Sequence, residues 1–173
     1  MVLALNASVM VGTMNSADTG IFDAPLRLMA RDRADIQVLS ALLQDAIVPG
    51  VDMLFDRDGE RFVFIANRFC WERPAMADVT GKQGEPVHER SLCVVRIEAV
   101  RRVLQTNMPS KRDKALLNLL AVFVGAGGCH GTFVDLMFSA GTTLRLLGDN
   151  LEVAAEDVDS TRPTTFRLKH HRC

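Results

Sequence analysis

The chain has 173 residues, of which 48% are hydrophobic and 24% charged, and its formal net charge is −1. A chain of this length can bury a sizeable core without disulfides or metal ions, and it fits a single domain. The near-zero net charge excludes the overall basic field by which some proteins recruit nucleic acid or anionic membranes.

The four cysteines are widely spaced, and no two of them form a Cys-x-x-Cys pair. Cys70 and Cys93 lie in apolar runs, where a free thiol behaves as a small hydrophobic side chain. We therefore expect free thiols in a reducing compartment, the cytoplasm. The start of the chain lacks the positive segment and the unbroken apolar segment of a signal peptide. The longest apolar run, residues 115–127, is shorter than the ~20 residues that span a bilayer.

The first predicted elements are a short strand at residues 25–30 and an amphipathic helix at residues 33–47. Asp32 is placed to cap the helix, and Pro49-Gly50 is a typical stop signal. The apolar residues that recur at helical spacing are Ile36, Leu39, Leu43, Ala46 and Ile47.

Residues 51–66 predict a β-hairpin that turns at Asp58-Gly59, a dipeptide suited to a two-residue type I′ turn. The expected cross-strand pairs are Arg57 with Glu60, Asp56 with Arg61, Phe55 with Phe62, Met53 with Phe64, and Val51 with Ala66. Charge pairing and apolar pairing agree on this register, and a slip of one residue would break both. The opposite face is also apolar, with Leu54, Val63, Ile65, Phe69 and Trp71. Both faces of the hairpin therefore need a cover, and the preceding helix is the nearest one.

Residues 73–90 lack any periodicity and predict a long surface loop. The β-branched segment that follows predicts two strands, 91–97 and 100–106, which bend or pair at Glu98-Ala99. Residues 115–124 fit either a helix or a buried strand, and their second half favours a strand.

The last predicted elements are a hairpin and a short helix. The hairpin joins residues 132–139 to residues 142–148 and places five apolar side chains on one face: Val134, Leu136, Phe138, Leu144 and Leu146. Residues 151–158, LEVAAEDV, predict a helix that must dock on the sheet, because two turns are marginally stable alone.

These elements define an α+β fold of about seven strands, one early amphipathic helix and a short C-terminal helix. Because strands do not alternate with helices, we expect an antiparallel sheet, curled into a small barrel or packed as two layers. This architecture resembles the pleckstrin-homology-like barrel at the level of fold alone. The single domain covers residues 25–158, between a loosely ordered leader at 1–24 and a frayed basic tail at 159–173.

Several strings occur in an order that resembles one family of alphaproteobacterial proteins, domain of unknown function 2948 (DUF2948). The most specific strings are LSALLQDA in the predicted helix and the RF…NRF.WE pattern between Arg61 and Glu72. The resemblance covers residues 25–158, and this chain departs from the pattern in its longer N-terminus and its basic tail. It implies a bacterial cytoplasmic protein, and it implies no substrate, cofactor or catalytic residue.

The Gly-rich segment GAGGCHG, residues 125–131, is the first candidate site. Gly-rich loops bind phosphate where a strand runs into a helix, but here a strand follows, which favours a plain hairpin loop. Cys129 and His130 are candidate zinc ligands together with the tail residues His170, His171 and Cys173. Adjacent Cys and His are a poor spacing for two ligands, so we expect no metal or other cofactor.

A second candidate site is the end of the predicted strand at NRFCWE, where polar and aromatic residues alternate and can line a pocket. Its residues are Asn67, Arg68, Trp71 and Glu72. The alternative, which the usual solvent exposure of strand charges favours, is a surface ion pair between Arg68 and Glu72.

A third group of residues is basic: Arg101, Arg102, Lys111, Arg112 and Lys114. A solvated edge is favoured here over a nucleic-acid site, since the chain has no Tyr and its Phe residues fall at core-like positions.

No catalytic template fits the sequence, and no Gly-x-Ser-x-Gly turn is present. The sequence therefore favours a non-enzymatic binding or protein-interaction module, whose partner is another protein or a second copy of this chain. The alternative is an enzyme or metal-dependent protein that uses loop 125–131 with Cys129 and His130.

Overall fold

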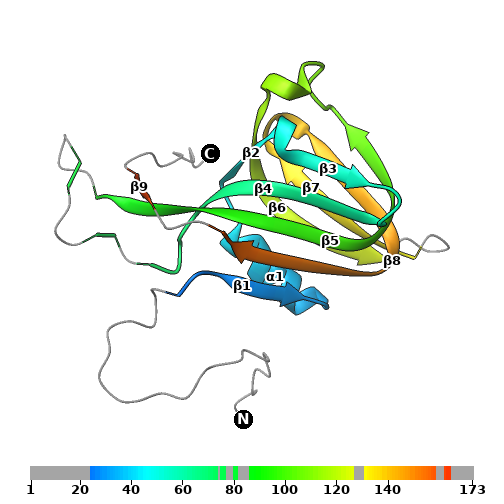
Figure 1. Ribbon diagram of the computed structural model, residues 1–173, viewed down its shortest axis with the longest axis horizontal. Coiled ribbons are helices and arrows are strands. Elements are labelled where there is room, and N and C mark those ends of the chain that lie inside the picture. Colours follow the sequence, from blue (N-terminus) through cyan, green and yellow to red (C-terminus); the bar gives the residue numbers. More distant parts are fainter. Residues whose placement is uncertain are drawn as a thin grey trace, which may run out of the picture.

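The computed structural model of the chain describes residues 24–73, 75–76, 80–81, 86–126, 131–158 and 162–164. Within these residues, nine strands form one antiparallel sheet, and one α-helix lies against it (Figure 1). The predicted α+β class and the antiparallel sheet are thus confirmed. The elements in chain order are β1 (Arg27–Ala30), α1 (Arg33–Leu42), β2 (Ala46–Pro49), η1 (Gly50–Asp52), β3 (Met53–Asp56), β4 (Arg61–Phe69), β5 (His88–Thr106), η2 (Arg112–Lys114), β6 (Leu116–Ala126), β7 (Thr132–Phe138), η4 (Ser139–Gly141), β8 (Thr143–Asp157) and β9 (Arg162–Thr164).

The sheet is strongly curled, which brings two strands far apart in its order into contact. Its strand order is β1-β8-β7-β6-β2-β4-β5-β9, with β3 paired to β4. β5 also pairs with β8, so the pairings run in a closed circuit through β5, β4, β2, β6, β7 and β8. The inward side chains of these strands therefore share one core.

The core is built from the side chains that alternate inward along the strands. Helix α1 contributes Ile36 and Leu39, and Leu43, which follows the helix, is buried with them. The Ser40 hydroxyl accepts a hydrogen bond of 2.9 Å from the Val122 backbone N–H in β6, so the helix is held to the sheet by a polar contact as well.

The predicted register of the β3–β4 hairpin is confirmed. Met53 pairs with Phe64, Phe55 with Phe62, and Asp56 with Arg61. The Asp56 carboxylate accepts a 2.9 Å hydrogen bond from Arg61 Nε, and it also accepts from the Gly59 N–H. The hydrogen bond from Gly59, followed by that from Arg61, lowers the pKa of Asp56.

The predicted type I′ turn is wrong, as are two of the predicted pairs. The positive φ falls on Glu60 (46°), and not on Asp58 and Gly59, because the connection is a four-residue loop. Arg57 lies over the Phe55 ring and makes no ion pair with Glu60 in the described part of the chain. Val51 has no partner in β4, since the chain forms the short η1 helix there.

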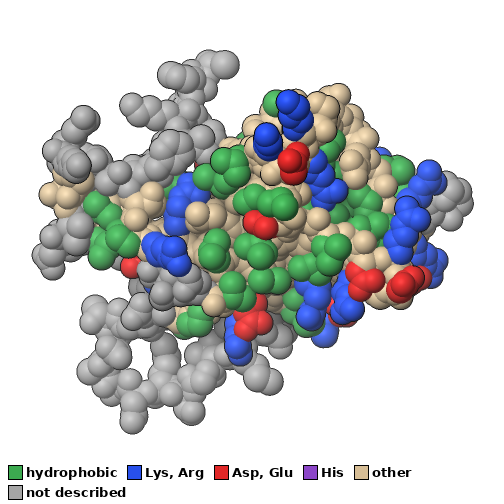
Figure 2. Space-filling model, turned by 45° about the horizontal axis from the view of Figure 1, so that its top comes forward, with side chains coloured by type: hydrophobic (Ala, Val, Ile, Leu, Met, Phe, Trp, Pro, Cys, Tyr) green, Lys and Arg blue, Asp and Glu red, His purple; other side chains and the backbone are tan. Residues whose placement is uncertain are grey.

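Only the inner face of this hairpin is fully covered. Met53, Phe62 and Phe64 are buried in the core, whereas Leu54 on the other face is 63% exposed. Figure 2 shows hydrophobic side chains on this outer face, over β3, β4 and β5. Helix α1 packs against β6 and β1, so it does not cover the outer face as we expected.

The predicted helix at 33–47 is too long, since α1 ends at Leu42. Asp45 has a positive φ of 62°, and its N–H donates to the Leu119 carbonyl of β6. Residues 46–49 then pair with β6 as β2. Apolar residues at both 43 and 46–47 fit a helix and a strand alike, and the pairing with β6 decides between them.

The two strands predicted at 91–97 and 100–106 are one long strand, β5, with a bend between them. Ala99 has a positive φ of 60°, and the register with β8 shifts on both sides of Val100. The bend was predicted correctly, and the alternative of a hairpin at this point is wrong.

The predicted helix at residues 151–158 is wrong, because this segment is the second half of β8. Alternate residues Leu151, Val153, Ala155 and Asp157 are buried, which is the period of a strand. β1 pairs with one side of this segment and β5 with the other. Ala, Leu and Glu favour a helix, but two neighbouring strands override that propensity.

The other predictions for the second half of the chain have mixed outcomes. Residues 115–124 lie almost wholly in a strand, β6, and β7 and β8 form the predicted hairpin. Its five inward side chains are all buried as expected. In the tail that was predicted to be frayed, Arg162–Thr164 pairs with β5 as β9. With β2 and β9 added, and with one strand in place of the two predicted at 91–97 and 100–106, the described residues contain nine strands in place of about seven.

The predicted loop at 73–90 is shorter than expected, because β5 begins at His88 and Val87 is already buried. Thr80 and Pro86 form an isolated β-bridge within it. In the described residues, no helix has the length and apolar character needed to cross a membrane.

Gly148 sits where β8 passes the bend in β5, between Val100 on one side and Thr132 on the other. A Cβ atom there would lie 1.9 Å from the Ala99 carbonyl oxygen, which is backbone and cannot swing away. We expect Gly148→Ala to lower the free energy of unfolding by about 2 kcal/mol, the usual range for overpacking. Urea unfolding measures this loss. Gly59→Ala is the control, because its Cβ meets only the exposed Asp56 and Arg61 side chains; equal losses in both variants would contradict the prediction.

Candidate functional site

The four residues predicted to form a site at the end of β4 make contacts with different partners. Arg68 and Glu72 are in contact, since Arg68 Nη2 lies 2.7 Å from Glu72 Oε1. The Trp71 indole N–H donates to the Gln44 carbonyl, and the Asn67 carbonyl accepts from Arg90. The predicted ion pair between Arg68 and Glu72 is present, but its expected surface position is wrong for Arg68, whose side chain is fully buried.

Arg68 is buried because its guanidinium is completely satisfied. Nε and Nη2 donate to the two Asp157 carboxylate oxygens at 2.9 and 2.7 Å. Nη1 and Nη2 donate to Glu72 at 3.1 and 2.7 Å, and Nη1 also donates to the Phe69 carbonyl at 3.2 Å. These bonds use all five N–H groups of an arginine. The arginine thus joins β4 to the end of β8.

The charges of this network hold one another in the ionised form. Burial by itself raises the pKa of Asp157, but hydrogen bonds from Arg68 and from the Leu26 N–H outweigh it, so the pKa is lowered. Burial likewise lowers the pKa of Arg68, and the two carboxylates more than offset this. The group is therefore a buried salt bridge, which fixes the position of the strands.

The aromatic residues at this end of β4 form a second structural cluster. The rings of Phe69 and Trp71 stack with their centroids 4.9 Å apart. The Arg90 guanidinium lies 4.0 Å from the centroid of the Phe69 ring, a cation–π geometry. The nearby thiols of Cys70 and Cys93 are buried, and burial raises their pKa values to about 11 and about 12. Both thiols are therefore protonated at neutral pH.

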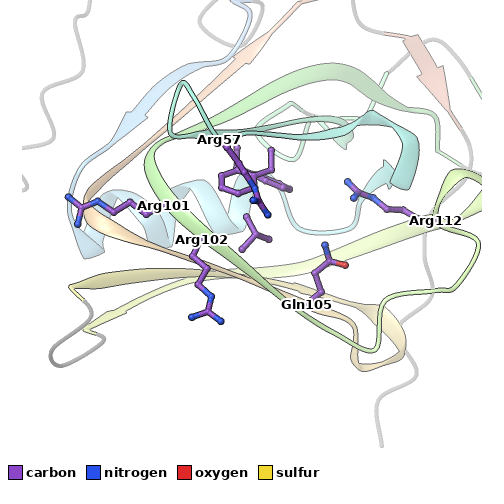
Figure 3. Close-up of a pocket in the computed structure, with 8 residues that line it drawn as sticks. Arg57, Arg101, Arg102, Gln105 and Arg112 are labelled. Carbon is purple, nitrogen blue, oxygen red and sulfur yellow. The ribbon is translucent and has the colours of Figure 1, made fainter.

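A pocket elsewhere in the described residues carries four arginines. Its cavity has a volume of about 420 Å³ and is lined by Phe55, Arg57, Phe62, Arg101, Arg102, Val103, Gln105 and Arg112 (Figure 3). None of these eight residues is acidic. We call this cavity the arginine pocket.

The arginines of the pocket differ in how they are held. Arg112 donates from Nε to the Gly50 carbonyl at 3.0 Å and from Nη2 to the Met53 carbonyl at 2.8 Å. Arg101 lies 2.6 Å from an Asp149 carboxylate oxygen. Arg57 and Arg102 have no carboxylate partner among the described residues. The pocket is therefore positive even after the ion pair between Arg101 and Asp149 is counted.

The side chains also differ in direction. In Figure 3, Arg57, Gln105 and Arg112 point toward the centre of the pocket, from the β3–β4 loop, β5 and η2 respectively. Arg101 and Arg102 lie at one end and point outward. Phe55, Phe62 and Val103 form an apolar floor, with Phe62 buried and the other two packed against the core.

The pocket lies beyond the point at which the pairing of β4 with β5 ends, at the bend in β5. Phe62 pairs with Ile97, and the Val100 N–H still reaches the Glu60 carbonyl at 2.6 Å. Beyond the bend, β5 continues along β8 only, from Arg102 to Thr106. The β3–β4 hairpin does not follow β5 past the bend. Side chains from β3, β5 and η2 therefore face one another across the space between the hairpin and the second half of β5.

The sequence predicted this pocket only in part. Arg101, Arg102 and Arg112 belong to the predicted basic group, whereas Lys111 and Lys114 do not line the cavity. Arg57 was assigned to an ion pair in the hairpin turn, and Phe55 and Phe62 to the core. The candidate ligands Cys129 and His130 lie outside the described residues, as do His170, His171 and Cys173.

Comparison with known proteins identifies the family but not an activity. Residues 26–170 match the family described as "Protein of unknown function (DUF2948)", and the chain belongs to this family. The family expected from the sequence is thereby confirmed, whereas the alphaproteobacterial origin stays a prediction. The match extends beyond the predicted limit at residue 158, so the expected departure of the basic tail from the family pattern is wrong for most of that tail. No curated protein and no solved structure matches the chain.

Substitution of one partner in the Arg68 network should be costly. Asp157→Asn leaves a fully buried guanidinium with one carboxylate in place of two, and we expect a loss of about 3 kcal/mol in the free energy of unfolding. The double variant Arg68→Met, Asp157→Asn should lose at least about 1 kcal/mol less, because the buried charge is gone. The neighbouring surface pair supplies the control: Glu156→Gln should lose less than about 1 kcal/mol. Urea unfolding measures all three variants, and an additive double variant would contradict the buried-charge explanation.

The same network predicts a dependence of stability on pH. The folded pKa of Asp157 is lowered, so its contribution is fully present above the unfolded pKa and is lost as the pH falls through the folded pKa. The urea midpoint of the native chain should fall steeply below about pH 4. Asp157→Asn should show a shallower fall over the same range, measured relative to its own midpoint at neutral pH. Parallel curves for the two proteins would refute this assignment.

Proposed function

We propose that this chain is a non-enzymatic binding module and that the arginine pocket is its ligand site. The observation that supports this most strongly is the gathering of four arginines and no acidic residue around one cavity, in a chain whose net charge is −1. Such a concentration of positive charge is costly in the unbound protein, and an anionic ligand removes that cost.

The chemistry of the lining favours binding over catalysis. Arginine stays protonated at all physiological pH values, and the amide of Gln105 does not titrate. The remaining lining side chains are Phe and Val, which have no polar atom. The eight residues therefore offer hydrogen-bond donors and apolar surface, and no nucleophile or general base.

The fold also supplies the rigidity that a binding site needs. The Arg112 guanidinium is fixed by two backbone carbonyls, and Phe62 is anchored in the core. A side chain that is already held loses little conformational entropy when the ligand binds. Arg112 and Phe62 are thus held in place before a ligand binds.

Binding of small anions tests the proposal. We expect inorganic phosphate, citrate or phenyl phosphate to bind with a stoichiometry of one in isothermal titration calorimetry at low salt. Arg57→Ala should weaken that binding about tenfold, the value of one charge-assisted hydrogen bond. Arg27→Ala makes the same change of charge outside the pocket, at an exposed ion pair with Glu156, and should leave the affinity unchanged. If none of the three anions binds, or if both variants weaken binding alike, the pocket is not the site.

A further inference from the structure

We infer that the ligand of the arginine pocket is a small amphiphilic anion, with a phosphate or carboxylate head group joined to an apolar body. This inference rests on the proposed function and narrows it to one class of ligand. It follows from the way in which the pocket separates its charged groups from its apolar ones.

The head group is positioned by the side chains that point to the centre of the pocket. Arg57 and Arg112 approach from opposite sides, and Gln105 approaches from β5 (Figure 3). The two carbonyls that fix Arg112 engage its Nε and one hydrogen of Nη2, and no described residue accepts from Nη1. A phosphate or carboxylate between the two guanidinium groups would accept from both of them.

The apolar body is required by the floor of the pocket. Phe55 and Val103 are half-buried and expose part of an aromatic ring and of a branched aliphatic side chain, whereas Phe62 is 2% exposed and belongs to the core. None of these groups can replace the hydrogen bonds that a polar ligand would lose on leaving water. An apolar group would instead gain by covering this floor, because apolar area of both is removed from water. An inorganic anion would leave this apolar surface uncovered.

The size and edges of the pocket argue against an extended peptide. A volume of about 420 Å³ is suited to a small molecule. A peptide that added to the sheet at the outer edge of β3 would need the carbonyls there as acceptors, and Arg112 already occupies that of Met53. One acceptor of the sheet edge beside the pocket is thus already used by a side chain.

A series of phosphate monoesters with equal charge tests this inference by calorimetry. We expect the affinity to rise from methyl phosphate to phenyl phosphate to 1-naphthyl phosphate, by about tenfold over the series, because apolar area is added. Val103→Asn should weaken 1-naphthyl phosphate several-fold and leave methyl phosphate unchanged. Phe55→Leu, which keeps an apolar side chain in the core, is the second variant, and it should reduce the same gain.

The outcomes separate the two proposals. Equal affinities across the series, with Arg57→Ala still weakening every ester, would overturn the amphiphilic ligand and leave the anion site intact. Absence of binding by all esters would overturn both. Tighter binding of hexaglutamate than of 1-naphthyl phosphate would also overturn the inference, in favour of an acidic peptide.

The same chemistry can come from a lipid or from a free metabolite, and one further arm distinguishes them. Sedimentation with vesicles that contain phosphatidic acid, lost in Arg57→Ala, would support the inference and assign the head group to a lipid. Binding of the soluble esters without sedimentation would support it and assign the ligand to a free molecule.

Discussion

The buried ion pair between Arg68 and Asp157 is the contact on which the arrangement of the sheet depends. It joins the end of β4 to the end of β8 across 89 positions of sequence. Asp157 also accepts from the Leu26 N–H, next to β1, so three segments meet at one carboxylate. A buried charge without its partner is strongly destabilising, so neither residue of this ion pair can be replaced alone without a large loss of stability. With β4 fixed at this end, the β3–β4 hairpin at its other end is carried to one defined place beside β5.

The arginine pocket follows from this arrangement and from a single irregularity in β5. β4 begins at Arg61 and pairs only with the half of β5 that precedes the bend at Ala99, whereas β8 pairs with both halves. The bend turns the second half of β5 away from β4, and Gly148 permits it because a larger residue would collide with the Ala99 carbonyl. The path of the backbone therefore brings together the side chains that line the arginine pocket, which come from three elements that are separate in sequence.

Local patterns in the sequence correctly predicted those parts of the structure that are determined by residues close to one another in the chain. The hairpin register from Met53 to Phe64 was correct because its charge pairs and apolar pairs lie within a few residues of one another. The helix predicted at 151–158 was wrong because β1 and β5 decide that segment, and neither is adjacent in sequence. Arg68 was predicted to be exposed, although it alternates with Phe62, Phe64 and Ala66 on the inward face of β4. This alternation can be seen in the sequence, but the sequence does not show that Asp157 is the carboxylate partner of Arg68.

The position of β8 in the sheet has a consequence for the order of folding. β8 pairs with β1, β5 and β7, and it is the last long strand of the described chain. During synthesis from the N-terminus, the edges and inner faces of the earlier strands remain exposed to solvent until β8 has been made. Contacts of such large sequence separation slow folding, because long loops must close before the contacts form. A nascent chain that stops short of β8 therefore has no closed core, and its exposed strands are available to other chains.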